Sequence, residues 1–197
     1  MDATTIYNLA LFLHLAGVLG LFAGLTIEGI ALRGIRHALT GDEARTWLGL
    51  LRPMRVIGPA ALALILLPGF YLVATIDQGG GWIAAGLLGF LVIAILGAAI
   101  TGRRMLVVGP ALGRAQGPLA DQKLRLARDG GLATSYATRL AIALGVVWLM
   151  TVKPDFLPSL LVLVAAAIAG LVAGRFLPTT PADRGPAASA VSGPGSR

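Results

Sequence analysis

The chain has 197 residues, of which 56% are hydrophobic and 13% are charged, and its mean hydropathy is +0.83. This composition is too apolar for a water-soluble domain and fits one compact membrane domain. Cysteine is absent, which excludes disulfides, zinc–thiolate sites, thiol catalysis and covalent attachment of a c-type haem.

Five apolar segments follow one another along the chain. Each is close to or above the roughly 20 residues that an α-helix needs to cross about 30 Å of hydrocarbon. We expect an all-α polytopic fold in which the first four helices form an antiparallel bundle and the fifth packs outside it. The tail over 177–197 is rich in Pro, Ala, Gly and Ser, so we expect a disordered cytosolic tail after a transmembrane domain over 1–176. The expected spans are 5–31, 56–76, 82–108, 134–152 and 156–176.

Charge predicts the orientation of these spans. All but one of the 16 Lys and Arg residues lie in the connections 33–55 and 103–139 or towards the C-terminal end, and the exception is Lys153. The positive-inside rule then places the N-terminus outside and the C-terminus in the cytosol of a bacterial inner membrane. The start, MDATTIYN, lacks the basic region of a cleaved signal peptide, so we expect the first helix to be retained.

The formal net charge of +7 does not indicate nucleic-acid binding. The basic residues flank apolar spans, and no aromatic residues alternate with them to form a stacking platform. We interpret them as topology signals and as contacts with the lipid bilayer through its anionic headgroups. Within the second basic connection, residues 117–131 are a candidate interfacial helix, with Pro118 in its first turn and Gly130 at its stop.

The first span contains a histidine and a glutamate within HLAGVLGLFAGLTIE (14–28). At about 100° per residue, His14, Gly17 and Glu28 share one helix face. An overlapping ridge of small residues is typical of close packing between membrane helices. We expect this side to point into the bundle, or to bind other membrane helices or a second copy of the chain. The ridge consists of Ala16, Gly20 and Gly24.

Glu28 lies near the cytosolic rim of the first span, about 21 Å along the helix axis from His14. The two side chains therefore cannot form a dyad. The leading interpretation of Glu28 is a structural ion pair with Arg55 or Arg139. The alternative is a proton or substrate gate, because ionisable groups inside a membrane are costly unless they are paired or used.

His14 lies near the middle of the bilayer. It is either a neutral imidazole hydrogen-bonded across helices, or an axial ligand of a haem or a copper ligand, or part of a proton relay. His37, the only other histidine, is about 35 Å further along a continuous helix, so both cannot ligate one haem within a chain. A second axial ligand would be a methionine, water or His14 of another copy. No grouping of serine, histidine and acid indicates nucleophilic catalysis.

Two motifs carry a resemblance to a known superfamily. LHLAGVLGLFAGL (13–25) and WLMTVKP (148–154) resemble the first helix and the closing motif of the superfamily that holds CopD-type copper-resistance membrane proteins and HemJ-type protoporphyrinogen oxidases. The similarity spans roughly residues 5–154 and is greatest to a family of bacterial integral membrane proteins of unknown function. It implies that His14 matches a haem-ligating histidine, with haem b as the cofactor, and that Lys153 and Pro154 match the closing motif.

The function expected from the sequence is that of a haem- or metal-associated integral membrane protein. One alternative is a non-catalytic scaffold or assembly protein that packs through its small-residue ridge. Another is a small transporter, in which His14, Glu28 and Arg139 would line the path.

Overall fold

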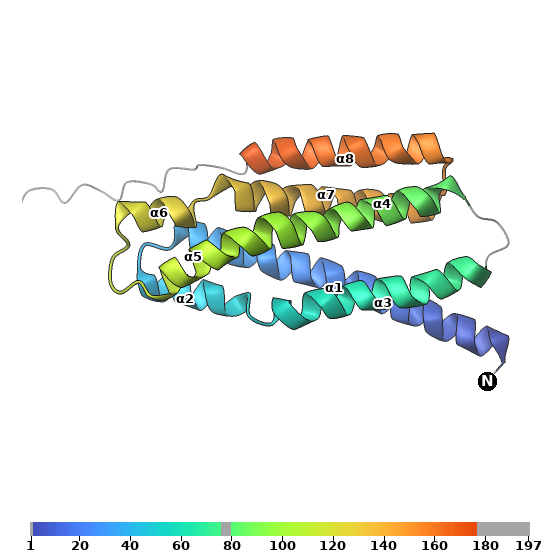
Figure 1. The fold of residues 1–197 in the computed structure, drawn as a ribbon, viewed down its shortest axis with the longest axis horizontal. Coiled ribbons are helices and arrows are strands. Elements are labelled where there is room, and N and C mark those ends of the chain that lie inside the picture. The colour runs from blue at the N-terminus through green and yellow to red at the C-terminus, as the bar shows by residue number, and fades with distance from the viewer. Residues whose placement is uncertain (1, 76–79, 177–197) are drawn as a thin grey trace, which may run out of the picture.

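The structure, a computed structural model, describes residues 2–75 and 80–176. Every regular element within these residues is a helix, and the long helices run up and down one common axis (Figure 1). The predicted disordered tail lies outside the described residues. In chain order the elements are α1 (Ala3–His37), α2 (Gly41–Leu50), α3 (Met54–Thr75), α4 (Gly81–Ile95), the π-helix η1 (Leu96–Gly102), α5 (Arg103–Gly113), α6 (Asp121–Ala127), α7 (Gly130–Val152) and α8 (Phe156–Phe176).

Five helical stretches are long and apolar enough to cross a membrane. In hydrocarbon, a helix is the structure in which one segment satisfies all of its own backbone polar groups, which is why long apolar runs adopt it. The predicted all-α polytopic fold is confirmed, and the protein is a multi-pass membrane protein. The stretches are Ala3–His37, Gly41–Thr75, Gly81–Gly113, Asp121–Val152 and Phe156–Phe176.

The helix α7 lies at the centre of the molecule, against α8, α4, η1 and α1. Half of its most apolar stretch is buried (50%), compared with 17–22% for the other four spans. The helix α8 packs on α7 and α4 and lies at one edge, as predicted for the fifth span, whereas α3 packs on α1 at the opposite edge (Figure 1).

Small residues bring α7 and α8 together. A Cβ atom at Gly170 of α8 would lie 2.5 Å from Cα of Thr138, so the two backbones touch there. One turn further, Gly174 lies in the same way against Thr134. Because lipid removes the hydrophobic drive between helices, such close van der Waals contact is a main source of their association.

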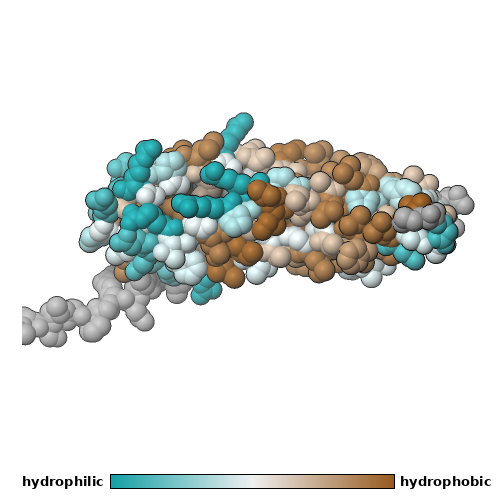
Figure 2. Space-filling model, turned by 90° about the horizontal axis from the view of Figure 1, so that it is seen from below, coloured by the Kyte–Doolittle hydropathy of each residue, from teal (hydrophilic) through white to brown (hydrophobic). Residues whose placement is uncertain are grey.

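The basic end of the molecule has a hydrophobic core of its own. The C-terminal parts of α1 and α5, together with α2, α6 and the start of α7, enclose it. Figure 2 shows hydrophilic residues gathered at this end, while hydrophobic residues cover the middle of the molecule. The buried side chains are Leu32, Ile35, Ala38, Ala44, Val108, Leu112, Ala115, Leu119, Ala127 and Leu132.

The first basic connection differs from expectation because it is mostly helical. The helix α1 continues to His37, and α2 follows within the predicted connection 33–55. A capping box starts α2: Oγ1 of Thr40 accepts from the backbone N–H of Glu43 at 3.3 Å, and the Glu43 carboxylate accepts from the backbone N–H of Thr40.

The second basic connection also differs. The helix expected over 117–131 is limited to α6, and Gly130, expected to stop it, instead begins α7. The reason is the side chain of Asp129, which accepts from the backbone N–H of Gly131 at 2.7 Å and so caps α7. The third span is not α-helical throughout, because η1 interrupts it between α4 and α5.

Candidate functional site

The ring of His14 extends from α1 to α3. Its Nδ1 lies 2.8 Å from the carbonyl oxygen of Ile65. A carbonyl oxygen only accepts, so Nδ1 is the donor, and in a neutral ring the lone pair is then on Nε2. A hydrogen bond across helices was one interpretation of His14, and it is compatible with a ligand role. Metal-ligating imidazoles commonly donate their other ring nitrogen to a backbone carbonyl or a carboxylate.

Glycines allow the ring of His14 to reach α3. A Cβ atom at Gly17, one turn after His14, would lie 2.8 Å from the backbone nitrogen of Ile65, so α1 and α3 are in backbone contact here. A Cβ atom at Gly69 would lie 3.1 Å from Nδ1 of His14. Pro68 lies inside α3 shortly after Ile65. Proline has no N–H to donate to the carbonyl four residues before it, here that of Leu64, and its ring distorts the turn that contains Ile65.

The second ring nitrogen of His14, Nε2, has no hydrogen-bond partner within residues 2–75 and 80–176. In this part of the chain, one side-chain nitrogen or oxygen is fully buried without a partner, and that atom is Nε of Arg139. Nε2 of His14, which also has no partner, is therefore not fully buried. The ring as a whole is half-buried. Nε2 is therefore not fully enclosed by the described residues.

Glu28 and Arg139 form an ion pair inside the bundle. Their side chains are 14% and 8% exposed, with the carboxylate supplied by α1 and the guanidinium by α7. Of the two partners considered for Glu28, the structure places Arg139 beside it, whereas Arg55 lies exposed at the start of α3. Pairing is the usual condition under which charged groups are tolerated within membrane helices.

A chain of hydrogen bonds leads from this ion pair into η1. Nη2 of Arg139 donates to Oγ1 of Thr101 at 3.1 Å, and Oγ1 of Thr101 lies 3.0 Å from Oγ of Ser135. Oγ of Ser135 donates its single proton to the carbonyl oxygen of Leu96 at 3.3 Å, so Thr101 is the donor to Ser135. All of the bonds therefore point the same way, and hydrogen bonds in such chains polarise one another.

The network ends where the third span changes from α to π geometry. Short π-helical segments within α-helices are rare and occur frequently at functional sites. Here η1 provides both the hydroxyl of Thr101 and the carbonyl of Leu96 to side chains of α7. The arrangement joins α1, α7 and η1 through polar contacts, and among the described residues it leaves one buried donor, Nε of Arg139, without a partner.

The small-residue ridge of α1 packs against α3 of the same chain. A Cβ atom at Gly20 would lie 3.3 Å from Cβ of Ala61, and one at Gly24 would lie 3.7 Å from Sδ of Met54. The third member, Ala16, is half-buried. The closest approach is at Gly17, which belongs to the His14 face rather than to the ridge.

The remaining predicted positions lie at the two ends of the molecule. Lys153 ends α7 in the left-handed conformation, with a φ of 53°, and its Nζ lies 5.7 Å from the centre of the Trp82 ring. Pro154 follows in the turn that leads to α8. His37 is the last residue of α1, at the basic end, and it does not share a site with His14.

The partners of His14 and of the Glu28–Arg139 ion pair have weaker sequence signals than the ionisable residues themselves. Ser135 lies four residues before Arg139, on the same face of α7. Thr101 is the one hydroxyl-bearing residue in the apolar run 82–108. A small hydroxyl one helical turn from an intramembrane arginine is the pattern that points to Ser135. The carbonyl of Ile65 has no side-chain signal, and only the nearby proline indicates a disturbed helix.

No protein-family model, no curated protein and no solved structure matches this chain.

Proposed function

We propose that the protein binds haem b through Nε2 of His14. The observation that supports this proposal is the hydrogen bond from Nδ1 to the carbonyl of Ile65, which selects the tautomer and holds the ring orientation that a ligating imidazole requires. The resemblance of residues 13–25 to the haem-ligating helix of HemJ-type proteins points to the same side chain. A bound haem supplies redox chemistry, and the part of this chain is to hold the iron through a neutral nitrogen.

A haem requires fewer protein ligands than a bare metal ion. The porphyrin provides four nitrogens, so one axial imidazole is enough to hold the iron, whereas zinc and copper sites generally use three or four protein ligands. In the part of the chain that the structure describes, no three His, Cys, Asp or Glu side chains lie together. The donor set around His14 therefore favours a haem over a bare ion. A sixth ligand would be water, a methionine or His14 of a second copy.

We also infer that the N-terminus lies outside and that the basic end faces the cytosol of a bacterial inner membrane. The stretches 33–55 and 103–139 carry most of the Lys and Arg residues, and both lie towards the same end of the molecule (Figures 1 and 2). The positive-inside rule assigns that end to the cytosol.

Two other functions have less support. A scaffold that binds partners through the ridge of α1 needs a free ridge, but Gly20 and Gly24 already face α3. A transporter needs ionisable groups along a path, but Glu28 and Arg139 are paired with each other. The haem proposal relies instead on an atom of His14 that is not fully buried and has no partner among the described residues.

The test is the visible absorption spectrum of the purified protein after expression with added haem precursor. Wild type should show a Soret band that changes on addition of imidazole or carbon monoxide. His14→Ala should insert into the membrane but lose the band, and His14→Met should keep part of it because a thioether also ligates iron. His37→Ala, which removes the other histidine, is the matched control and should keep the band.

Two results would contradict the haem proposal. A colourless wild-type protein would favour the scaffold function. A coloured His14→Ala protein would place the ligand elsewhere and leave His14 as a hydrogen-bonded structural residue.

A further inference from the structure

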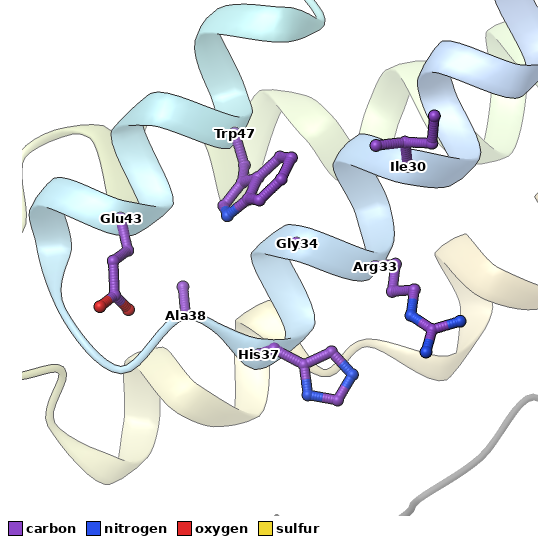
Figure 3. A pocket seen from close by; sticks show the side chains of 7 residues that line it. All are labelled: Ile30, Arg33, Gly34, His37, Ala38, Glu43 and Trp47. Atoms are coloured by element: carbon purple, nitrogen blue, oxygen red, sulfur yellow. The ribbon is translucent and has the colours of Figure 1, made fainter.

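A shallow cavity of about 340 Å³ lies between the C-terminal end of α1 and the helix α2. It occurs where the apolar part of α1 passes into the basic end of the molecule. Figure 3 shows two kinds of lining residue: Arg33 and His37 on one side, and Ile30 and Trp47 on the other, with Gly34 between them. Nothing in the proposed haem site involves these residues.

The basic wall comes from one face of α1. Arg33 and His37 are four residues apart and so are neighbours on the helix surface. Both are exposed, and neither forms an ion pair with a carboxylate among the described residues. Basic residues at a helix C-terminus also offset the negative end of the helix dipole. That role alone would not require aromatic and apolar side chains beside them in one cavity.

The apolar wall depends on Gly34, which leaves room for the indole of Trp47. The indole of Trp47 lies directly on Gly34, where any side chain would collide with the ring. Ile30 lies one turn earlier on α1 and is 51% exposed. Tryptophan is enriched at the boundary between hydrocarbon and headgroups. From Ile30 to His37 the lining changes from apolar to basic over about 10 Å of helix.

We propose that this cavity binds an anionic phospholipid, with its phosphate at Arg33 and His37 and the beginning of an acyl chain along Ile30 and Trp47. The headgroup layer is about 5–8 Å thick on each side of the hydrocarbon, so the roughly 10 Å of helix over which the lining changes is long enough to cross it. Basic pockets at this depth are typical binding sites for anionic lipid headgroups. A soluble phosphate would satisfy the basic wall but would leave the apolar wall without a partner.

Glu43, the acidic residue of the cavity lining, does not neutralise Arg33 or His37. Oε2 of Glu43 accepts from the backbone N–H of Leu39 at 2.8 Å and from that of Thr40 at 3.4 Å. Its carboxylate is thus engaged in the cap of α2 and forms no ion pair with Arg33.

Quenching of Trp47 fluorescence by brominated lipids tests this proposal. The chain has three tryptophans, so the variant Trp82→Phe/Trp148→Phe retains Trp47 as the only one. The protein is reconstituted into phosphatidylcholine vesicles that contain a small fraction of brominated phosphatidylglycerol or of brominated phosphatidylcholine. We expect the anionic lipid to quench Trp47 about fivefold more effectively, which is the scale of one basic side chain near a membrane surface.

Charge variants in the same background separate this cavity from the general surface charge. Arg33→Gln should abolish most of the preference, and His37→Gln should reduce it. Arg114→Gln removes the same charge from an exposed position at the end of α5 and should leave the preference unchanged. Quenching by brominated phosphatidylcholine should be equal in all variants, which verifies that Trp47 stays in place.

Four results would overturn the proposal. One is equal quenching of the parent protein by both lipids, and another is an equal loss of preference in Arg114→Gln and Arg33→Gln. A third is loss of the preference on addition of inorganic phosphate, which would assign the cavity to soluble anions. The last is an absence of quenching by either lipid, which would place Trp47 away from the membrane surface.

Discussion

The carboxylate of Glu28 and the guanidinium of Arg139 meet where water has little access to either, since their side chains are 14% and 8% exposed. Removal of one partner leaves the other as an uncompensated buried charge, which costs about 3–5 kcal/mol. Removal of both partners leaves no charge behind. The two residues should therefore be strongly coupled in their effect on stability.

A double-mutant cycle on thermal unfolding in detergent measures this coupling. Glu28→Leu and Arg139→Met should each lower the stability by about 3–5 kcal/mol. The double variant should be more stable than either single variant. Thr101→Val removes the hydrogen bonds of Thr101 with Arg139 and with Ser135 but leaves the ion pair, and at about 0.6 kcal/mol for each bond it should lower stability by only about 1 kcal/mol. Strictly additive losses in the double variant would show that the two charges do not depend on each other.

At this scale the sequence indicates the charged residues better than their partners. His14, Glu28 and Arg139 stand out because ionisable side chains are rare within apolar spans. Whether Glu28 pairs with Arg139 or with Arg55 depends on how the helices pack around α1. The apolar pattern of each span does not predict which helices become neighbours. The acceptor of the His14 bond is a backbone carbonyl, and every residue of α3 has one.

Among the helices, α7 and α8 show most directly how small residues determine packing. Gly170 and Gly174 of α8 are four residues apart and lie on the backbone of α7. Replacement of Gly170 by leucine would force the two backbones apart at Thr138, whereas Gly58 of α3 has open space around it. A bulky side chain at Gly170 should therefore lower the stability of the protein, and the same side chain at Gly58 should be tolerated.

We predict that Gly170→Leu lowers the stability of the detergent-solubilised protein by about 1–3 kcal/mol or more, in the range of overpacked interiors. Gly58→Leu is the matched control and should unfold close to the wild-type temperature. The measurement is the thermal unfolding midpoint of the three proteins in one detergent. Equal midpoints for both variants would mean that the face of α8 with Gly170 does not pack on α7.

The existence and order of the membrane helices can be predicted from the sequence, because length and apolarity alone determine which segments can cross hydrocarbon. The short helices at the basic end are harder to predict. The helix α2 lies in a connection rich in charge, where the sequence from Thr40 to Glu43 is a capping-box signal. The helix η1 has no local sequence signal, because its π geometry accompanies contacts that Thr101 and Leu96 make with α7.

Over the whole molecule, the two hydrophobic cores lie in different surroundings. One lies among α1, α4, η1, α7 and α8 within the spans, and the other lies under the basic connections at one end. If the basic end faces the cytosol, the depth of three features in the membrane can be assigned. His14 then lies in the hydrocarbon, the Glu28–Arg139 pair lies near the cytosolic rim, and the cavity of Arg33 and Trp47 lies among the headgroups.

This placement can be measured with single cysteines, because the chain contains none of its own. Three exposed positions report on the two ends: Ala3 at the start of the first span, Ala120 between α5 and α6, and Asp155 between α7 and α8. A membrane-impermeant maleimide should label Ala3→Cys and Asp155→Cys in intact spheroplasts. It should label Ala120→Cys only after the membrane is permeabilised. Labelling of Ala120→Cys in intact spheroplasts, or protection of Ala3→Cys and Asp155→Cys, would contradict the orientation from which the depths of the haem, ion-pair and lipid sites are taken.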